Sequence, residues 1–499
     1  MPMLSSVLND FEEKYGYPLK LKSGDGDISV DHVTGDSRDT FKNSVFCCIK
    51  GENSDGLDYA SAAAANGAVA FLSDRKPAEN LPWIMTGNVR RDMGRLSALV
   101  YGEPCEKLKM FAVTGTNGKS TTAWMIRHIL RSCGIKTGIF GTIVYDDGSG
   151  EREAERTTPE SCEIQRLLAE MVKNGCLACV MEASSHGLDL GRLEGCAFDG
   201  AVFTNLSEEH LDYHGAIENY FLAKERLFTA FMKPGWRTAC NADDPWAKRL
   251  IERFSPAAVP FGLEPAGEGY FASVTSSDAS GSGFGVSTPE GGNIRVFLPL
   301  PGRFNVYNAL GAIALLFPFI EDRSAISAAL KTMPQVPGRL ERYFFSNGAC
   351  AVIDFAHTPA ALKNVLSELR LMCGGVLTAV FGHGGERFRQ NRPLLGLYGA
   401  QICDKLIITM DNPRGEDPAD IAGQIMEGVA GSGKETGARI ILDRREAVRA
   451  ALDEAGDGDI VAVTGKGPEK FISIKGRFIP YSDRDTVLEW ARERGLTWR

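Results

Sequence analysis

The stretch Met110-Phe-Ala-Val-Thr-Gly-Thr-Asn-Gly-Lys-Ser-Thr-Thr122 decides the fold of this chain. Its first residues form an apolar run short enough for one buried strand, and a helix-like segment, residues 123–130, follows the stretch. The glycine-rich turn between them is typical of a loop that binds phosphate, because free backbone N–H groups and the helix dipole both attract an anion. The sequence therefore predicts a strand, a phosphate-binding loop and a helix in this order.

The side chains of this loop fit a nucleotide. Gly115 and Gly118 let the backbone turn tightly and approach the ligand. Lys119 supplies a positive charge for the terminal phosphates, and Ser120 can hold Mg²⁺. The two glycines are separated by two residues, whereas the usual phosphate-binding loop has four between them. We nevertheless predict nucleotide binding, because the loop lies between a buried strand and a helix.

Composition bounds the class of protein. A chain of 499 residues suggests about three domains, and 43% hydrophobic with 24% charged residues is ordinary for a globular protein. The net charge of −9 and the lack of a basic cluster argue against a nucleic-acid partner. No apolar run approaches the ~20 residues that span a bilayer, and acidic residues stand where a secretory signal would be apolar. We expect a cytoplasmic protein without a membrane partner, acting as a monomer.

The twelve cysteines show no repeating interval, so we interpret them as reduced and mostly buried thiols. One CxxC pattern, Cys176-Leu-Ala-Cys179, runs directly into an apolar segment. A redox or zinc site would require a second pair or a helix start. We therefore assign this pattern to a core strand.

The alternation of apolar runs and helical stretches predicts an α/β fold with a mostly parallel sheet covered on both faces, from Met110 to about Leu330. Residues 262–300 are rich in Gly and Ser and then β-prone, and we expect an inserted hairpin or edge region there. Val336-Pro-Gly-Arg339 is interpreted as a hinge. A further βα series follows it, with strands expected at residues 351–354, 376–381, 405–409 and 459–463.

Polar residues after two predicted strands are candidates for a metal site. Glu182 ends an apolar strand, and a carboxylate at that edge of a parallel sheet would face the phosphates and suit Mg²⁺, although a structural acid is the alternative. His210 and His214 follow another strand at a spacing that also occurs in zinc sites, but no third ligand lies at a suitable distance. We assign His210 to Mg²⁺ and leave His214 structural. By the sequence alone, Lys224 on an amphipathic helix is a solvated lysine.

Together these motifs resemble those of the Mur ligase family, in order and over nearly the whole chain. The segments that carry the resemblance are residues 114–120, 157–159, 182–186, 204–206, 210–215, 223–225, 241–244, 302–308, 337–339, 354–359, 411–414 and 465–467. The resemblance implies three α/β domains: an N-terminal UDP-sugar-binding domain (1–108), a central doubly wound ATP-binding domain (109–337) and a Rossmann-like C-terminal amino-acid-binding domain (338–499).

The resemblance also implies the ligands of individual residues. Its ATP site falls on Gly115, Thr116, Asn117, Gly118, Lys119, Ser120, Thr121, Asn305, Asn308, Arg339, Asp354 and His357. Its Mg²⁺ ligands fall on Ser120, Glu182, His210 and Lys224, with Lys224 carbamylated to N6-carboxylysine, which reverses the assignment of that lysine to solvent. Lys119, Lys224, Arg339 and His357 take the catalytic roles.

Two further ligand sites follow from the same resemblance. The UDP-linked substrate falls on Ser37, Arg38, Asp55, Gly56, Thr157, Thr158, Ser185 and Arg192. The added amino acid falls on Arg389, Asp411, Asn412, Arg414, Gly465 and Glu469. An intact Asp-Asn-Pro-Arg at 411–414 goes with meso-diaminopimelate in this family, and an arginine binds the extra carboxylate of that amino acid bidentately.

The implied activity is an ATP-dependent amide ligase of peptidoglycan precursor synthesis, hence of cell-wall growth, cell shape and division. It would add meso-diaminopimelate to UDP-N-acetylmuramoyl-L-alanyl-D-glutamate through an acyl phosphate. Lysine or ornithine as the added amino acid stays open, because Glu386, Phe388, Pro468 and Leu190 depart from the family pattern. A folylpolyglutamate synthetase-like ligase and a non-catalytic ATP-binding scaffold are the more distant alternatives.

Overall fold

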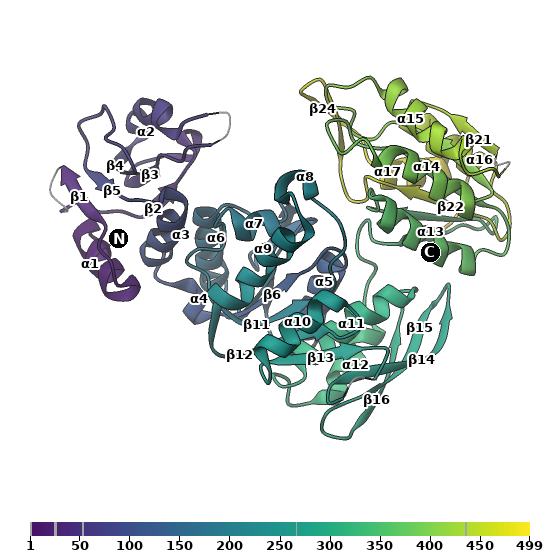
Figure 1. Cartoon of the computed structure of the whole chain (residues 1–499), viewed down its shortest axis with the longest axis horizontal. Coiled ribbons are helices and arrows are strands. Elements are labelled where there is room, and N and C mark those ends of the chain that lie inside the picture. Colours follow the sequence, from purple (N-terminus) through teal and green to yellow (C-terminus); the bar gives the residue numbers. More distant parts are fainter. Residues whose placement is uncertain (1, 24–26, 52–53, 266, 435–436) are drawn as a thin grey trace. The chain divides into compact units, whose positions relative to one another are not determined.

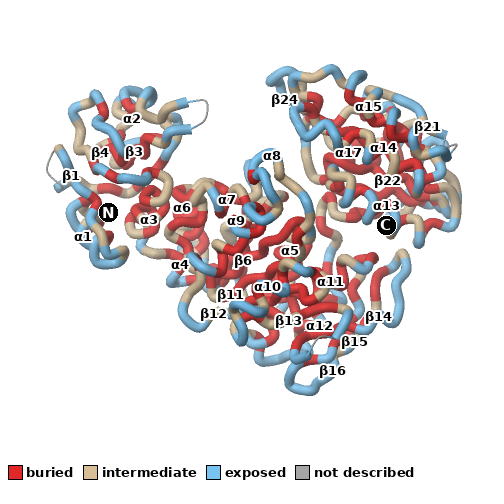
Figure 2. The backbone as a smooth tube through the Cα atoms, viewed as in Figure 1, coloured by how far each residue is buried: buried red, intermediate tan, exposed pale blue. Residues whose placement is uncertain are grey.

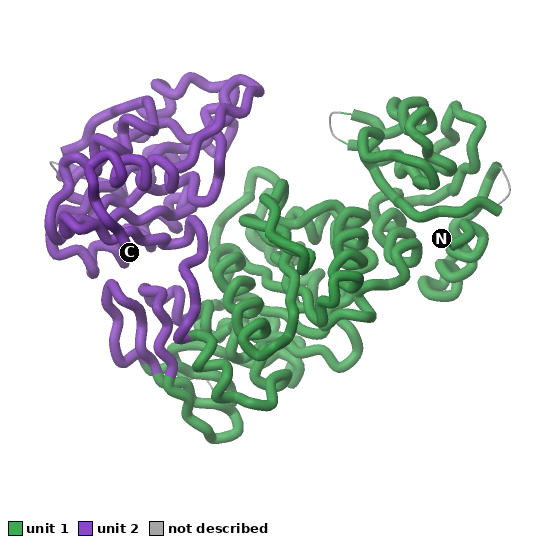
Figure 3. Tube along the Cα trace, turned by 180° about the vertical axis from the view of Figure 1, so that it is seen from behind, with its two compact units in different colours: residues 1–273, 285–295, 307–330 green, residues 274–284, 296–306, 331–499 purple. Residues whose placement is uncertain are grey.

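The computed structural model describes residues 2–23, 27–51, 54–265, 267–434 and 437–499. The chain divides into two compact units (Figure 3). Unit 1 comprises residues 1–273, 285–295 and 307–330, and unit 2 comprises residues 274–284, 296–306 and 331–499. Each unit is built around a largely parallel sheet whose central strands are buried, whereas several edge strands are exposed (Figure 2).

Unit 1 begins with a small α/β part. Its five-stranded sheet has the order β1-β5-β4-β3-β2. The elements are α1 (Leu4–Tyr15), β1 (Lys20–Ser23), β2 (His32–Thr34), η1 (Ser37–Asp39), β3 (Ser44–Cys47), η2 (Gly56–Tyr59), α2 (Ala60–Asn66), β4 (Ala68–Ser73), β5 (Trp83–Met85), α3 (Val89–Val100) and α4 (Pro104–Lys107). The alanine run forms α2 and ends where Gly67 takes a left-handed conformation (φ +113°).

The central sheet has the order β16-β15-β14-β13-β12-β11-β6-β10-β7-β8-β9 (Figure 1). Its strands are β6 (Lys109–Thr114), β7 (Thr137–Phe140), β8 (Val144–Asp146), β9 (Glu151–Glu153), β10 (Ala178–Glu182), β11 (Phe198–Phe203), β12 (Met232–Asn241), β13 (Ala258–Gly262), β14 (Tyr270–Asp278), β15 (Gly281–Ser287) and β16 (Asn293–Leu298). The strands from β13 to β7 pair in parallel, as the sequence predicts.

The order of the strands marks one edge of the central sheet as a candidate ligand site. The chain moves from β6 to β7 and β10 on one side, and then crosses to β11 on the other. Ligands of open α/β sheets bind at the carboxyl ends of the strands where the order reverses. The loops that follow β6, β10 and β11 meet there.

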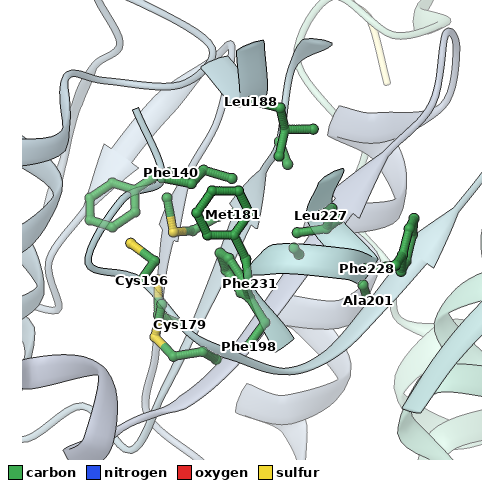
Figure 4. Close-up of a cluster of buried hydrophobic side chains, with 14 of the residues drawn as sticks. Phe140, Cys179, Met181, Leu188, Cys196, Phe198, Ala201, Leu227, Phe228 and Phe231 are labelled. Atoms are coloured by element: carbon green, nitrogen blue, oxygen red, sulfur yellow. The ribbon is translucent and has the colours of Figure 1, made fainter. Parts of the chain in front are cut away.

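Helices cover the central sheet on both faces. They are α5 (Lys119–Ser132), α6 (Ser161–Lys173), α7 (Ser185–Asp189), α8 (Leu211–His214), α9 (Ile217–Ala230), α10 (Pro245–Phe254), α11 (Arg303–Leu316) and α12 (Arg323–Lys331). One face carries an apolar cluster in which Met181 of β10 and Phe198 of β11 lie near Leu227 and Phe228 of α9 (Figure 4). The apolar side of α9 is thereby fixed against the sheet, and that helix also carries Lys224.

The Gly- and Ser-rich segment 262–300 forms β14, β15 and β16 at one edge of the central sheet, which confirms the expected edge region. Only residues 279–280 connect β14 to β15. Such a short connection joins antiparallel neighbours as a hairpin.

The main sheet of unit 2 has six strands in the order β17-β18-β22-β19-β20-β21. They are β17 (Glu341–Phe344), β18 (Cys350–Asp354), β19 (Leu377–Phe381), β20 (Lys405–Ile408), β21 (Gly437–Ile440) and β22 (Ile460–Thr464), and the hairpin β23 (Phe471–Ile474)–β24 (Arg477–Pro480) follows. The helices are α13 (Pro359–Met372), α14 (Asn391–Ile402), α15 (Pro418–Ala430), α16 (Arg444–Asp453) and α17 (Asp483–Glu493). The four predicted strands are confirmed within one residue at each end.

Successive residues of these strands belong alternately to two separate apolar clusters, one on each face of the sheet. Val352, Ala379 and Ala462 belong to one, and Ile353, Val380 and Val463 belong to the other. Both faces of the sheet are therefore covered, which is why its strands read as continuous apolar runs.

The structure also bears on the expectations about the cysteines, membrane-spanning helices and domain boundaries. All twelve cysteines are unpaired, eleven of them are buried, and Cys179 lies within β10, as predicted for a core strand. Among the described residues, no helix is both long and apolar enough to cross a bilayer. The small α/β part belongs to unit 1 because α3 packs on the central region: a Cβ on Gly94 would lie 2.3 Å from the Glu194 carbonyl oxygen. The boundaries at residues 108 and 337 stay predictions.

A buried ion pair ties the carboxyl ends of β20 and β22 to α16 and α17. Both side chains are fully buried: Arg444 donates to the two carboxylate oxygens of Asp483 at 2.8 Å each, and the Tyr481 hydroxyl donates to the same carboxylate. Arg444 also donates to the carbonyl oxygens of Thr464 (2.9 Å) and Met410 (3.3 Å). The pair thus fixes the starts of the two loops that follow those strands.

We expect Arg444→Met to lower the free energy of unfolding by about 3–5 kcal/mol, because it leaves Asp483 charged, buried and without its cation. Urea denaturation followed by circular dichroism measures the change. The control is Arg445→Met on the same helix, where the exposed pair with Glu489 contributes about 1 kcal/mol or less. Equal stability of the two variants would contradict the assigned role of Arg444.

Candidate active site

The phosphate-binding loop follows β6 and opens α5, as the sequence predicts. Gly118 is the N-cap of α5 at φ +87°, and Gly115 has φ +141°. A Cβ on Gly115 would lie 2.0 Å from the Thr204 hydroxyl, and one on Gly118 would lie 2.3 Å from Asn308 Oδ1. Both positions therefore require glycine for their conformation and for the space around them.

Two lysine side chains converge on the backbone of this loop. Lys119 Nζ donates to the carbonyl oxygens of Gly115 (3.0 Å) and Thr116 (2.7 Å), and Lys224 Nζ donates to Gly115 at 2.8 Å. Lys224 is 1% exposed, and its ammonium lies 4.4 Å from the centre of the Tyr220 ring. Burial, with Lys119 nearby, lowers the pKa of Lys224 well below its ordinary value. The interpretation of Lys224 as solvated was wrong: its face of α9 points into the site.

Glu182 ends β10 next to the loop. Its Oε2 accepts from the Ser120 hydroxyl at 2.9 Å and from the Thr142 hydroxyl at 3.0 Å, and its Oε1 accepts from the Thr142 backbone N–H at 2.9 Å. A Cβ on Gly141 would lie 2.2 Å from Oε1. The carboxylate is buried and held in one orientation beside Ser120. The sequence analysis missed Thr142, because no motif marks the loop after β7.

His210 precedes α8 with a left-handed backbone (φ +56°), a strained conformation that is found most often at functional sites. Its ring lies 4.8 Å from the His186 ring and 6.2 Å from the Tyr220 ring. Burial lowers the pKa of His210 to about 4, so its imidazole is neutral near pH 7. A neutral imidazole can donate a ring-nitrogen lone pair to a metal ion. His214 is buried, and its Nε2 has no hydrogen-bond partner among the described residues.

The donor atoms fit Mg²⁺ better than zinc. Within the described part of the chain, no group of three or more His, Cys, Asp and Glu side chains is arranged to hold a metal. Ser120 and Glu182 instead present hard oxygen atoms beside the phosphate loop, the ligand type that Mg²⁺ prefers.

The residues expected around the nucleoside lie on α11, just before β17, and at the end of β18 or just after it. Asn305 and Asn308 are three residues apart on α11; Asn305 donates to the Pro301 carbonyl oxygen at 2.7 Å, and Asn308 accepts from the Thr122 hydroxyl at 3.3 Å. In unit 2, the guanidinium of Arg339 lies 4.6 Å from the centre of the Phe355 ring, and His357 lies beside the same ring.

Asp354 anchors this second group. Its carboxylate accepts from the backbone N–H groups of Leu340 and Ala356, both at 2.8 Å. Burial raises the pKa of Asp354, and Arg339 opposes that shift. Arg339, Asp354 and His357 therefore form one cluster at the carboxyl end of β18.

The central residues expected for the UDP-linked substrate surround Glu182. Thr158 donates to the Glu182 carbonyl oxygen at 2.8 Å, and Arg192 donates to the Thr158 carbonyl oxygen at 3.2 Å. The Thr157 hydroxyl lies 3.1 Å from that of Thr142, and Ser185 begins α7 just beyond β10. A carboxylate bound by this group would lie close to the phosphate loop.

The N-terminal residues expected for the same substrate form two turns that both contact α2. Ser37 and Arg38 begin η1, where the Arg38 side chain is 89% exposed and pairs with Asp36. Asp55 caps η2, and its carboxylate accepts a hydrogen bond from the Arg75 guanidinium at 2.7 Å. Gly56 packs closely on Ile49: a Cβ added to Gly56 would lie 2.5 Å from the backbone nitrogen of Ile49. The fold places both turns on the same small α/β part.

The residues expected for the added amino acid lie in the loops after β19, β20 and β22. Asn412 donates to Glu469 Oε2 at 2.9 Å, and a Cβ on Gly465 would lie 2.5 Å from Asp411 Oδ2. Arg414 has a left-handed backbone (φ +51°) and donates to the Gly385 carbonyl oxygen. The sequence-based set is thus brought together from distant segments.

Arg389 lies at the rim of this group. Its guanidinium is 67% exposed and pairs with Glu416 at 3.1 Å. Glu416 also binds the fully buried Arg392, whose guanidinium lowers the pKa of that carboxyl to about 2. No role was predicted from the sequence for Arg392, Glu416 or Lys466, because a single charged residue carries no local signal of burial, although Lys466 lies within the motif at 465–467.

Three protein-family models match successive parts of the chain. The "Mur ligase family, catalytic domain" matches residues 29–100, the "Mur ligase middle domain" residues 113–316, and the "Mur ligase, glutamate ligase domain" residues 338–467. The UDP-N-acetylmuramoyl-L-alanyl-D-glutamate–2,6-diaminopimelate ligase of Halalkalibacterium halodurans is 36% identical over 496 residues, which cover 99% of this chain and 100% of that relative.

Solved structures agree with this match. A structure of a UDP-N-acetylmuramoyl-L-alanyl-D-glutamate–2,6-diaminopimelate ligase superimposes with a TM-score of 0.67 at 31% identity and covers 98% of this chain and 99% of that one. The MurF ligase of Thermotoga maritima, solved in complex with ADP, shares the fold at a TM-score of 0.64 and 18% identity, over 93% of this chain and 97% of that one. By its full-length identity to these relatives, the chain belongs to the Mur ligase family.

Proposed function

We propose that this protein is the ATP-dependent ligase that adds meso-diaminopimelate to UDP-N-acetylmuramoyl-L-alanyl-D-glutamate. The observation that carries the proposal is the 36% identity, along the whole of both chains, to a ligase named for that reaction. The cytoplasmic location, the monomeric state and the three domain roles predicted from the sequence are part of the same proposal.

ATP would bind with its phosphates on the loop Gly115–Thr121. Ser120, Glu182 and His210 would hold Mg²⁺, together with Lys224 once carbamylated, and the bound ion would offset the charge of the phosphates. Arg339, Asp354 and His357, together with Asn305 and Asn308 of α11, are the further residues that we propose for the nucleotide.

Carbamylation of Lys224 has physical support. The side chain is buried against Gly115 and lies near a second ammonium, that of Lys119, so its neutral amine is favoured. The amine nitrogen would add to the carbon of CO₂ and release one proton, giving a carbamate. This converts a repelled cation into an anion that Lys119 attracts.

The reaction needs no nucleophile from the protein. A carboxylate oxygen of the UDP-linked dipeptide attacks the γ-phosphorus of ATP, and the acyl phosphate and ADP result. The amine of diaminopimelate then attacks the acyl carbon, and phosphate leaves as the amide forms and a proton is released. Lys119 and the backbone N–H groups at the start of α5 stabilise the phosphoryl charge, while Thr157, Thr158 and Arg192 position the acceptor.

Diaminopimelate is favoured over lysine and ornithine by Arg414. The guanidinium is half-buried, and burial lowers its pKa, so a carboxylate partner stabilises it. Diaminopimelate carries a second carboxylate, which lysine and ornithine lack. A folylpolyglutamate synthetase-like role is opposed by the family match at residues 29–100, a region which such ligases lack. A non-catalytic scaffold would not need Glu182, His210 and Lys224 together.

Phosphate release tests the activity. We expect release that depends on UDP-N-acetylmuramoyl-L-alanyl-D-glutamate and is stimulated by meso-diaminopimelate more than by lysine or ornithine. Lys119→Ala should lower kcat by about 100-fold or more, because it removes a charge that stabilises the transferred phosphoryl group, while the UDP-linked substrate still binds. Near-normal turnover in this variant would contradict the mechanism, and stimulation by lysine alone would contradict the substrate.

Gly118→Ala should abolish ATP binding, because the added Cβ meets Asn308 Oδ1 and has to shift the loop. Titration calorimetry with a non-hydrolysable ATP analogue measures the affinity. The matched control is Gly134→Ala, since Gly134 also has a positive φ (+78°) but nothing lies within 4 Å of its Cβ position. The control should lose some stability and keep its affinity; ATP binding by Gly118→Ala at the wild-type level would exclude the loop as the site.

Arg414→Leu should reduce the preference for meso-diaminopimelate over lysine, expressed as a ratio of kcat/KM values. Loss of the guanidinium–carboxylate pair removes about 2–4 kcal/mol of discrimination, roughly 30- to 1000-fold. Arg477→Leu on the exposed strand β24 is the control and should keep the ratio. An unchanged ratio in Arg414→Leu would assign the choice of amino acid to other residues.

A further inference from the structure

Lys466 is a fully buried lysine whose ammonium lies within the group of residues expected to bind the amino acid. It follows β22 directly after Gly465 and has 0% exposure. Its Nζ donates to Glu469 Oε2 at 2.8 Å and to Asn412 Oδ1 at 3.1 Å, and lies 3.9 Å from Asp411 Oδ1. A buried ammonium is costly unless such partners surround it, so its position is set by these three side chains.

The orientation of the Asn412 amide depends on this ammonium. Asn412 Oδ1 accepts from Lys466 Nζ and from the Ser473 backbone N–H at 2.9 Å. Two donors at one atom require the amide oxygen there and place the NH₂ group on the other side. That NH₂ group donates to Glu469 Oε2 at 2.9 Å.

The Glu469 carboxylate is consequently held by one of its two oxygens. Both side-chain hydrogen bonds go to Oε2, and within the described part of the chain Oε1 accepts none. The Glu469 side chain is 28% exposed, whereas the Lys466 side chain is fully buried. Oε1 is therefore the atom that Glu469 offers to a ligand, and a carboxylate oxygen of this kind binds an ammonium group.

We propose that Lys466 is a positioning residue for the amino-acid substrate: its buried ammonium orients Asn412 and Glu469 so that Glu469 Oε1 receives a substrate ammonium. The inference rests on the proposed function, because it requires that these loops bind an amino acid. Lys466 does not touch the substrate and acts through Glu469. Its charge also offsets the two carboxylates of Asp411 and Glu469, which would otherwise repel each other across the site.

The test compares Lys466→Met with the wild-type enzyme in the phosphate-release assay. We expect the KM for the amino acid to rise about tenfold or more, while the KM values for ATP and the UDP-linked substrate stay within about twofold, because only the amino-acid site loses its alignment. Lys405→Met makes the same chemical change at the exposed start of β20 and should leave all three KM values unchanged. An equal rise of the three KM values, or no rise at all, would overturn the proposal.

A double-mutant cycle with Glu469→Gln separates positioning from a general structural role. If Lys466 acts through Glu469, Lys466→Met should change the KM for the amino acid by less than about twofold once Glu469 has been replaced. Full additivity of the two effects would show that Lys466 acts elsewhere. The cycle uses whichever of diaminopimelate, lysine and ornithine supports turnover by the wild-type enzyme, so a wrong substrate assignment is recognised before any variant is compared.

Lys466→Gln guards against misfolding of the methionine variant. Its amide keeps N–H donors for Asn412 and Glu469 without the charge, and we expect an intermediate rise in the KM for the amino acid. Thermal unfolding and circular dichroism establish whether each variant is folded. Failure of both variants to fold would overturn the proposal in favour of a purely structural role for Lys466.

Discussion

The chemistry of unit 1 depends on two lysine ammonium groups that meet at one carbonyl oxygen. Lys119 and Lys224 both donate to Gly115; Lys224 is buried, and Lys119 is partly exposed. Two cations at such a short distance repel each other. The repulsion is relieved by anions bound beside them or by neutralisation of one amine. Bound phosphate groups and a carbamate on Lys224, both of which we propose, would act in that direction. The positive-φ backbone of Gly115 and the hydrogen bonds to its carbonyl oxygen keep the two lysine side chains together.

A buried lysine also lies at the centre of the group in unit 2, but there a single cation is surrounded by carboxylate and amide side chains. Lys466 is the buried cation, and Asn412, Asp411 and Glu469 are gathered around it. Behind this group the Arg444–Asp483 pair fixes the carbonyl groups of Met410 and Thr464, from which the two loops start. In both units, a buried lysine thus donates hydrogen bonds to groups at the carboxyl ends of the strands, next to the residues proposed to bind ligands.

Features of the fold that are encoded by a local sequence pattern could be predicted from the sequence. The apolar strands, the glycine-containing loop after β6 and the helix that follows it were confirmed, because short-range periodicity and glycine spacing encode them. The burial of Lys224 could not be predicted in that way, since its helix α9 is apolar on a broad arc and the contact partner, Gly115, is more than a hundred residues distant. The role of Thr142, and the contacts of Lys466 with Asp411 and Asn412, were not predicted for the same reason: these partners come together only when parallel strands bring distant loops to one edge of the sheet.

The departures from the family pattern have local explanations in the structure. Pro468 packs against Gly338, where an added Cβ would lie 2.4 Å from the Pro468 nitrogen, so the proline fills space against the 336–339 segment. Glu386 keeps a carboxylate in the loop after β19, and it accepts from the Gly415 backbone N–H at 3.3 Å, directly beside Arg414. The side chain of Phe388 is exposed, outside the apolar core. These contacts leave the guanidinium of Arg414 available for the carboxylate that we propose it binds, so the altered positions do not oppose diaminopimelate as the added amino acid.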